Sequence, residues 1–485
     1  MRTSLHTSLV LLALFSACED PSLVTTPPLD RLYFPNGLSH LKVAGKTNGV
    51  LLVANANSNK LYGTGSVVAL DLDAITDLPP MGGTGSIVKI TELGSSERQS
   101  VAIASFASGV NVVEQEPGVR WRIYVPTRSE RNRLYQVDLT FDGATPVLSC
   151  VGGGTGQNCV DTGLSLTPRE FEFSSTGVPR APQPYAVAAQ VRSCTTVAEC
   201  CPSNAPDCGR SCSAGACVGR DSVPLSDLWV THTQQADSPN GTNTNLRSYV
   251  VRIESDDFNV TADSFVPIGF GPSNSAVALG PWVYLTGRIA APSPNLLRMV
   301  SRDATTIVST GLENSFRVSD SRALVLSSNK KRFYMVGRVP DTLLVTNLYN
   351  PESALPSVSF ARAVPMIDAA NEAQVISRAG MGDLVVVSGS SFVGSLAIYD
   401  DDLGDVATII NGIGSQPAYI AVDHRGTSAR VYVSNFLDGR IAIIDIPDLA
   451  RPQSARLVGH MGRQQGCLVT GQNSPQCAAS GELLE

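Results

Sequence analysis

Charged side chains are scarce in this chain, because Asp, Glu, Lys and Arg make up only 16% of its 485 residues, against roughly 25% in an average soluble domain. Blocks of basic residues are missing as well, and 43 acidic side chains outnumber 36 basic ones, which gives a formal net charge of −7. Phosphate binding needs clustered Lys and Arg. We therefore expect no nucleic-acid partner. The hydrophobic content of 43% also excludes a disordered chain.

Long hydrophobic runs are absent too, since no segment approaches the 18 apolar residues that a transmembrane helix needs. The chain begins with a short positive region at Arg2 and continues with a brief apolar run from Leu9 to Phe15. Such a run is too short to cross a bilayer and is typical of an export signal. We predict that residues 1–17 are a signal peptide and that the mature protein has no transmembrane helix.

The apolar run ends in Phe15-Ser16-Ala17-Cys18, which resembles the lipobox of bacterial lipoproteins, with Phe15 at the position where Leu is usual. The resemblance implies that Cys18 is lipidated and becomes the new amino terminus. It places the protein at the bacterial cell envelope, attached to the membrane by lipid, with the outer membrane or the cell surface favoured. Residues 18–28 are polar and contain Pro and Thr, as expected of a tether. The alternative is an ordinary secretory signal with an unrelated cysteine.

Cysteine usage supports export. The chain has 11 cysteines, so lipidation of Cys18 leaves an even number, which indicates disulfides in an exported protein. The remaining cysteines are Cys150, Cys159, Cys194, Cys200, Cys201, Cys208, Cys212, Cys217, Cys467 and Cys477. Cys150 with Cys159, and Cys467 with Cys477, bracket short Gly-containing loops, so local pairing is the simplest interpretation. Residues 461–485 are predicted to be a C-terminal disulfide loop and tail.

Six of these cysteines fall within residues 194–217. A segment this small has almost no apolar core, so cross-links must hold it together. Sequence cannot choose among the alternative pairings of six cysteines. Zinc is the competing explanation, but the segment has no Cys-x-x-Cys knuckle and no nearby histidine. We predict a disulfide-rich insertion without a metal. The segment resembles small secreted modules with an adjacent Cys pair, and this resemblance implies no activity.

A repeat of apolar runs organises the rest of the chain. The sharpest unit, residues 416–446, contains three β-branched and aromatic-rich runs separated by turns. Seven versions of its middle run can be found: VLLVAN (50–55), RIYVPT (122–127), DLWVTH (227–232), WVYLTG (282–287), RFYMVG (332–337), LVVVSG (384–389) and RVYVSN (430–435). Each is followed by a similar run and preceded by another, the preceding runs including HLKVAG (40–45) for the first unit and SVAIAS (100–105) for the second. This pattern predicts strands and almost no helix.

Strand triplets at a spacing of about 50 residues, with a weaker fourth strand, describe the blades of a β-propeller. The segments Tyr432-Val433-Ser434-Asn435 and Ile441-Ala442-Ile443-Ile444-Asp445 resemble the signature of the YVTN family of bacterial seven-bladed propellers. The segments 52–55 and 68–71 are a second match, whereas the fourth and fifth units lack the Asn and the terminal Asp. We predict an all-β, seven-bladed β-propeller with loop insertions over residues 29–460, with the 194–217 insertion in the third blade.

Closure of the ring has two candidate strands. One is LDRLYFP (29–35), which would lie beside the last blade, and the other is SARLVGH (454–460). We expect the N-terminal strand to close the ring, because joining the ends removes exposed sheet edges.

Residue patterns for chemistry are few. The histidines beyond the signal are His40, His232, His424 and His460, and none has a partner at metal-ligand spacing. The acidic run from Asp400 to Asp405 lacks the alternation of a Ca²⁺ loop and is interpreted as a solvated turn. We therefore name no catalytic residue, no metal ligand and no cofactor.

Two functions remain open. We favour a membrane-tethered, non-catalytic binding scaffold with a protein or a cell-wall polymer as its partner, and we expect the cysteine-rich insertion to make the specific contact. The alternative is an exported propeller enzyme, because related propellers include lactonases and quinoprotein oxidoreductases. Such an enzyme would need side chains from several innermost strands to converge in the central tunnel.

Overall fold

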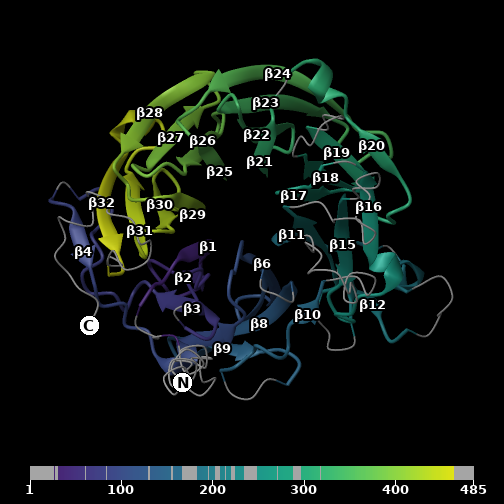
Figure 1. Cartoon of the computed structure of the whole chain (residues 1–485), viewed down its shortest axis with the longest axis horizontal. Helices are drawn as coiled ribbons and strands as arrows, with labels where there is room; N and C mark the ends of the chain where they lie inside the picture. The colour runs from purple at the N-terminus through teal and green to yellow at the C-terminus, as the bar shows by residue number, and fades with distance from the viewer. Residues whose placement is uncertain are drawn as a thin grey trace, which may run out of the picture.

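The computed structural model describes Pro27 and residues 31–60, 62–83, 85–128, 132–153, 157–166, 183–194, 196–201, 208–213, 215–219, 224–233, 248–269, 271–287, 296–316 and 318–463. Within them, seven sheets of four or five strands surround a central axis (Figure 1). No helix among the described residues has the length and the apolar character needed to cross a membrane. The all-β, seven-bladed β-propeller is therefore confirmed.

The first four blades are built as follows, from the axis outward. Blade 1 contains β1 (Pro35–Leu41), β2 (Val50–Asn55), β3 (Gly65–Asp71) and β5 (Ser100–Ile103). Blade 2 contains β6 (Asn111–Glu116), β7 (Arg120–Thr127) and β8 (Arg133–Asp142), with β9 (Thr145–Cys150) and β10 (Leu164–Ser165) both on the outer side of β8. Blade 3 contains β11 (Pro184–Val191), β14 (Ser226–His232), β15 (Ser248–Glu254) and β16 (Phe265–Gly269). Blade 4 contains β17 (Ala276–Leu279), β18 (Trp282–Thr286), β19 (Leu297–Ser301) and β20 (Ile307–Ser309).

The last three blades follow the same order. Blade 5 contains β21 (Asp320–Leu326), β22 (Arg332–Arg338), β23 (Thr342–Tyr349) and β24 (Ser357–Pro365). Blade 6 contains β25 (Ala370–Ile376), β26 (Leu384–Gly389), β27 (Ser395–Asp400) and β28 (Asp405–Asn411). Blade 7 contains β29 (Pro417–His424), β30 (Ala429–Asn435), β31 (Arg440–Ile446) and β32 (Arg456–Met461), with β4 (Val88–Ile90) as a fifth strand.

A small hairpin and five short 3₁₀ turns complete the described structure. The hairpin consists of β12 (Ser211–Ser213) and β13 (Ala216–Val218). The 3₁₀ turns are η2 (Glu97–Gln99), η3 (Val197–Cys200), η5 (Ala262–Ser264), η6 (Leu312–Asn314) and η7 (Pro452–Ser454).

The apolar middle strands account for the packing between blades. Alternate residues of a strand point to opposite faces of its sheet, so a strand buried on both faces is apolar throughout. In β30, Tyr432 faces the cluster shared with blade 1, while Val431 and Val433 face the cluster shared with blade 6. Each of the seven contacts between neighbouring blades has its own hydrophobic cluster, including the contact between blades 7 and 1. The core is therefore a closed circle of interfaces between sheets.

Ring closure differs from the prediction. Residues 31–35, the described part of the predicted closing strand 29–35, do not add a strand to the last blade. The chain runs instead into β1, which pairs with β2 as the innermost strand of blade 1. The outer strand of blade 7 is β32, which overlaps the alternative candidate, and it pairs with β31. Apart from β4 in blade 7, each blade thus takes its strands from one stretch of chain, and packing between blades 7 and 1 closes the ring.

A segment of blade 1 reinforces this closure. The connection between β3 and β5 crosses to the far side of blade 7, where β4 pairs with β32 in parallel. Its backbone also contacts a buried ion pair of blade 7: Gly82 N–H donates to the Asp445 carboxylate at 2.8 Å, and the Pro79 carbonyl accepts from Arg430 at 2.8 Å. We call residues 79–90 the strap.

Two of the expected first strands were also misplaced. SVAIAS (100–105) contains β5, the outer strand of blade 1, and the inner strand of blade 2 is β6. HLKVAG (40–45) overlaps only the end of β1. Inner strands line the axis and are only partly buried, so they lack the uninterrupted apolar run by which the middle strands were recognised.

Candidate functional site

The inner strands share an irregularity where they begin. In β1, β11, β21, β25 and β29 the pairing register shifts near the first residues, because one extra residue is accommodated on the inner strand. Such β-bulges re-aim side chains and are common beside functional sites. Because every blade repeats the same antiparallel order, these bulges all lie at one end of the axis, which we call the bulge end.

Side chains from five blades meet at the bulge end. Tyr185 of β11 and Tyr419 of β29 have ring centroids 6.0 Å apart, although their blades are separated by blades 1 and 2. The Arg128 guanidinium, after β7, lies 5.6 Å from the centre of the Tyr185 ring. Arg322 of β21 and Glu372 of β25 interact electrostatically with Tyr185. We call Arg128, Tyr185, Arg322, Glu372 and Tyr419 the bulge ring.

The Glu372 carboxyl has an unusual environment. Its side chain is half-buried, and it accepts a hydrogen bond from the Ala373 N–H at 3.2 Å. Burial raises the pKa of Glu372 to about 8, because removal from water disfavours the charged form. Burial, with added repulsion from Glu372, also raises the pKa of Tyr185. Glu372 is therefore mostly neutral at pH 7.

The two arginines of the bulge ring have unused donors. Arg322 pairs with Asp320 at 2.5 Å, whereas Arg128 makes no ion pair with a residue that the structure describes. The Nε atoms of both Arg128 and Arg322 are buried without a hydrogen-bond partner in the described part of the chain. Buried donors of this kind are normally satisfied, so the site has capacity for an acceptor.

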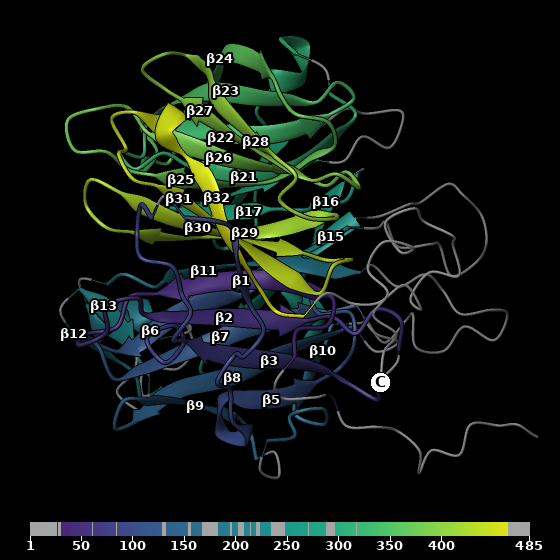
Figure 2. The same ribbon diagram turned by 90° about the vertical axis from the view of Figure 1, so that its left-hand side faces the viewer.

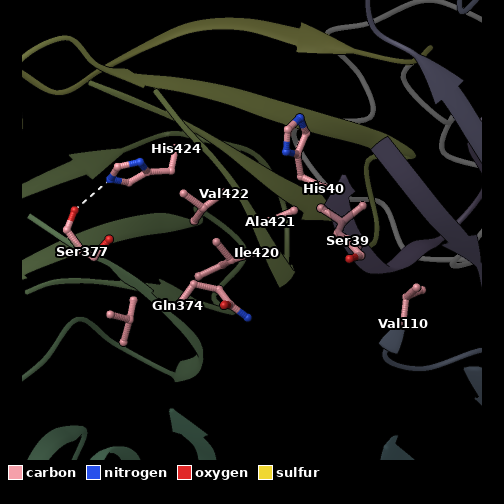
Figure 3. A pocket seen from close by; sticks show the side chains of 11 residues that line it. Ser39, His40, Val110, Gln374, Ser377, Ile420, Ala421, Val422 and His424 are labelled. Atoms are coloured by element: carbon pink, nitrogen blue, oxygen red, sulfur yellow. Dashed lines mark hydrogen bonds between the residues drawn. The ribbon is translucent and has the colours of Figure 1, made fainter. Parts of the chain in front are cut away.

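A cavity of about 320 Å³ lies among the inner strands of blades 1, 6 and 7 (Figure 3). It is lined by Leu38, Ser39, His40, Val110, Gln374, Val375, Ser377, Ile420, Ala421, Val422 and His424. Its lining begins close to the bulge ring on two strands, since Ile420 follows Tyr419 and Gln374 lies two residues after Glu372. The volume is at the lower end of the range for small-molecule sites.

The histidines near this cavity have structural partners. His424 Nε2 lies 2.8 Å from the Ser377 carbonyl oxygen (Figure 3). His40 Nε2 lies 2.8 Å from the Asn48 carbonyl oxygen, and burial lowers the pKa of His40. His460 likewise contacts the Ile413 carbonyl oxygen at 3.0 Å. His232, at the end of β14, is buried, and its ring centroid lies 4.7 Å from that of Tyr249.

The described cysteines are all in disulfides. The pairs are Cys150–Cys159, Cys194–Cys212, Cys200–Cys217 and Cys201–Cys208. The sulfur atoms of Cys194, Cys200 and Cys217 lie within 4.8 Å of one another, but each is bonded to another sulfur and is not a thiolate, which zinc would require. Cys18, Cys467 and Cys477 lie outside the described residues, as do the predicted signal peptide and all of the predicted tether except Pro27.

The disulfide-rich insertion is attached to blade 3 by ion pairs. Arg210 donates to Glu254 at 2.7 Å, to Asp256 at 3.1 Å and to the Cys200 carbonyl at 3.0 Å. Arg192, just before the insertion, bridges Asp227 and Glu254 at 2.6 and 2.7 Å. The insertion follows the end of β11, so it lies at the end of the axis opposite to the bulges, where β12 and β13 are seen in Figure 2. We call this the module end.

Acidic residues of the run from Asp400 to Asp405 form ion pairs with arginines of blades 5 and 6. Arg378 pairs with Asp400 at 2.6 Å and with Asp402 at 3.1 Å. Arg332 pairs with Asp401. The charge of the run is therefore compensated largely by arginines.

Sequence reasoning missed the bulge ring entirely. Its members are far apart in the chain and match no known motif. A signal was nevertheless present, because Pro35, Pro184 and Pro417 each begin an inner strand directly before its bulge. Proline has no N–H for the sheet and is tolerated at the first residue of a strand or at a bulge.

No family model and no curated protein matches the chain, so the likeness to YVTN propellers stays a resemblance. Among solved structures, the Cps50 (Swd1) β-propeller domain of Myceliophteria thermophila is 10% identical, with a TM-score of 0.47 over 86% of this chain and 97% of that chain. The hydrazine synthase of Kuenenia stuttgartiensis is 12% identical, with a TM-score of 0.29 over 40% of this chain and 49% of that chain. These similarities are too low to carry an argument about function.

Proposed function

We propose that the protein is an exported, lipid-anchored β-propeller that serves as a non-catalytic binding scaffold at the bacterial cell envelope. The observation that carries this proposal is the pairing of all eight described cysteines in disulfides. Disulfides form and persist in oxidising, extracytoplasmic compartments. The resemblance of residues 15–18 to a lipobox supports a lipid anchor at Cys18.

The arrangement of the ring supports a scaffold with two different ends. The chain joins blade 1 at the bulge end, where Tyr33 N–H donates to Asn55 Oδ1 at 3.3 Å and the Tyr33 hydroxyl to Ser66 Oγ at 2.9 Å. The disulfide-rich insertion lies at the module end. A tether preceding residue 31 would therefore hold the bulge end towards the membrane and present the insertion away from it. We propose a protein or a cell-wall polymer as the partner of the insertion.

Lipidation is tested by phase partitioning of the full chain after expression in a bacterium. Cys18→Ser should move the protein from the detergent phase to the aqueous phase, because the lipid is its only proposed attachment. The Cys150→Ser/Cys159→Ser double variant is the matched control and should stay in the detergent phase. A Cys18→Ser protein that remains in the detergent phase would refute the anchor.

The scaffold role is tested with isolated cell envelopes. The soluble Cys18→Ser protein should co-sediment with them, and replacement of residues 194–217 by a short Gly-Ser linker should abolish co-sedimentation while the propeller keeps its circular dichroism spectrum. Equal co-sedimentation of both proteins would refute a contact through the insertion and would indicate that another part of the ring binds the envelope.

An exported propeller enzyme, lactonase-like or quinoprotein-like, is the second candidate, and the bulge ring is the observation that favours it. Perturbed carboxyl groups cluster at catalytic sites, and Glu372 is of this kind. Native mass spectrometry and metal analysis of the purified full chain separate the two proposals. A stoichiometric metal ion or quinone would overturn the non-catalytic role.

A further inference from the structure

The bulge ring has the electrostatics of an anion site. Arg128 has no carboxylate partner in the described part of the chain, and its guanidinium lies over the face of Tyr185, 5.6 Å from the ring centre. The charge of Arg322 is balanced by Asp320 at 2.5 Å, yet its Nε remains without an acceptor. A guanidinium presents a planar fork of donors that matches carboxylate and phosphate groups.

Glu372 does not cancel this positive charge at neutral pH. Glu372 interacts electrostatically with Tyr185 of β11 and Tyr419 of β29, and Arg128 acts on the same two tyrosines. The neighbouring β21 carries the ion pair between Arg322 and Asp320. Arg338 of β22 is held by the carbonyls of Ala369 and Ala370, and Asp341 accepts from the N–H groups of the same two residues. No cation within this set pairs with Glu372, and burial raises its pKa to about 8. The carboxyl is therefore mostly protonated at pH 7 and can donate a hydrogen bond.

The cavity among the inner strands of blades 1, 6 and 7 suits a small molecule. The cavity of about 320 Å³ begins within two residues of Glu372 and Tyr419 on their own strands. Its walls combine aliphatic side chains such as Ile420 and Val422 with the polar Ser39 and Gln374. Apolar walls with a few convergent polar groups are the usual composition of ligand pockets.

We propose that the bulge ring and its cavity bind a small organic oxyanion, whose carboxylate or phosphate group contacts Arg128 while the rest of the molecule occupies the cavity. This inference rests on the binding role of the proposed function and is independent of the lipid anchor. It names a second binding site, in the channel, in addition to the insertion at the module end.

Isothermal titration of the soluble Cys18→Ser full chain tests the proposal with three probes of similar size: glucuronate, glucose 6-phosphate and glucose. Glucuronate or glucose 6-phosphate should bind at least tenfold more tightly than glucose, and the better of the two identifies the anionic group. Arg128→Gln should lower that affinity at least tenfold. Arg98→Gln, which removes an exposed arginine paired with Asp142 on the outside of the ring, should leave it unchanged.

The pH dependence adds a readout that a structural role of Arg128 does not produce. Affinity for the anion should fall as the pH rises through about 8, because ionised Glu372 repels it. Glu372→Gln should keep binding and lose this dependence. Affinity that rises with pH, an Arg128→Gln variant with normal binding, or equal binding of glucose would each overturn the proposal. Membrane partitioning is measured in a separate experiment, so the lipid anchor and the oxyanion site can each be refuted without the other.

Discussion

Blades 3 and 7 share a topology but differ at two places: the residue that ends the second strand, and the partners of a buried aspartate. At the end of the second strand, blade 7 has Asn435 and blade 3 has His232, and each is paired with the proline that opens the inner strand. Asn435 Nδ2 donates to the Ile413 carbonyl at 2.7 Å. His232 is equally buried, but neither ring nitrogen has a partner in the described residues. Asn435 thus holds the incoming chain in place, and blade 3 lacks that contact among its described residues.

The second difference concerns buried charge. In blade 7, Arg430 and Asp445 are both almost fully buried and joined by two hydrogen bonds of 2.6 and 2.9 Å. In blade 3, the buried Asp227 is approached by Arg192 and by Arg302 of blade 4, at 2.6 and 2.5 Å. Each charged centre supports an additional segment: in blade 7 the strap, which comes from blade 1, and in blade 3 the blade's own disulfide-rich insertion.

The two blades differ in how an inserted segment relates to the core: the strap is part of the core of blade 7, whereas the disulfide-rich insertion is attached to the outside of blade 3. The strap contributes backbone groups to an enclosed ion pair and a strand to the sheet, so it cannot leave without exposing Arg430 and Asp445. The disulfide-rich insertion has its own small cluster, which includes Cys194, Cys200 and Cys217, and reaches the blade through Arg210. It should therefore loosen without unfolding the ring.

The largest effect should follow from Asp445→Asn. The substitution leaves the Arg430 guanidinium buried without a countercharge and removes the carboxylate that accepts the Gly82 N–H. Losing one partner of a buried pair costs about 3–5 kcal/mol. Urea unfolding of the soluble full chain, followed by tryptophan fluorescence, measures the loss of stability.

Asp138→Asn is the matched control for this variant. Arg122 and Asp138 form the same cross-strand pair in blade 2, with distances of 2.8 and 3.0 Å, but their side chains are 14% and 15% exposed and no strap covers them. Water can replace the lost contact there, so we expect a cost of about 1 kcal/mol. Equal losses in the two variants would show that enclosure by the strap adds nothing.

The next effect is specific to acid. Burial lowers the pKa of His232 to about 3, whereas the unfolded chain binds the proton near pH 6.5. The unfolded state therefore takes up a proton that the folded state refuses as the pH falls from about 6.5 towards 3. The free energy of unfolding should not depend on the protonation of His232 above about pH 6.5. Below that pH it should decrease by at most about 1.4 kcal/mol per pH unit.

His232→Phe isolates this contribution, because it keeps a ring against Tyr249 and cannot titrate. Unfolding midpoints measured between pH 7 and pH 4 should fall less steeply in the variant than in the parent chain. A parent and a His232→Phe variant with identical slopes would mean that His232 is protonated in the folded state.

Other blades show which strands the sequence could predict. The middle strands were predicted closely, β2 and β26 to the residue, because burial on both faces leaves an uninterrupted apolar run. Inner strands face the axis on one edge, so β6, with its sequence NVVEQE, was missed and β5 was taken in its place. The prediction that the N-terminal strand completes the last blade was wrong. No local sequence pattern distinguishes the innermost strand of the first blade from a strand that completes the last one.

The bulge ring could not be predicted because it depends on closure of the ring. Tyr185 and Tyr419 come within 6.0 Å only when blades 3 and 7 face each other across the axis. The perturbed pKa of Glu372 depends on burial by other blades. Each of these residues is ordinary in its own segment, and only the prolines before the bulges are visible in the sequence.

The smallest effect should come from Arg210→Gln, which removes the ionic contact between the disulfide-rich insertion and blade 3. Glu254 keeps Arg192, at 2.7 Å, so no charge is stranded in the core, and we expect a local cost of about 1 kcal/mol. Amide exchange of residues 208–218 should become several-fold faster, and more so at low salt than at high salt when compared with the parent chain. The urea midpoint of the ring should not change. If it falls as far as in Asp445→Asn, the insertion is part of the core, as the strap is, and the distinction between the two blades is lost.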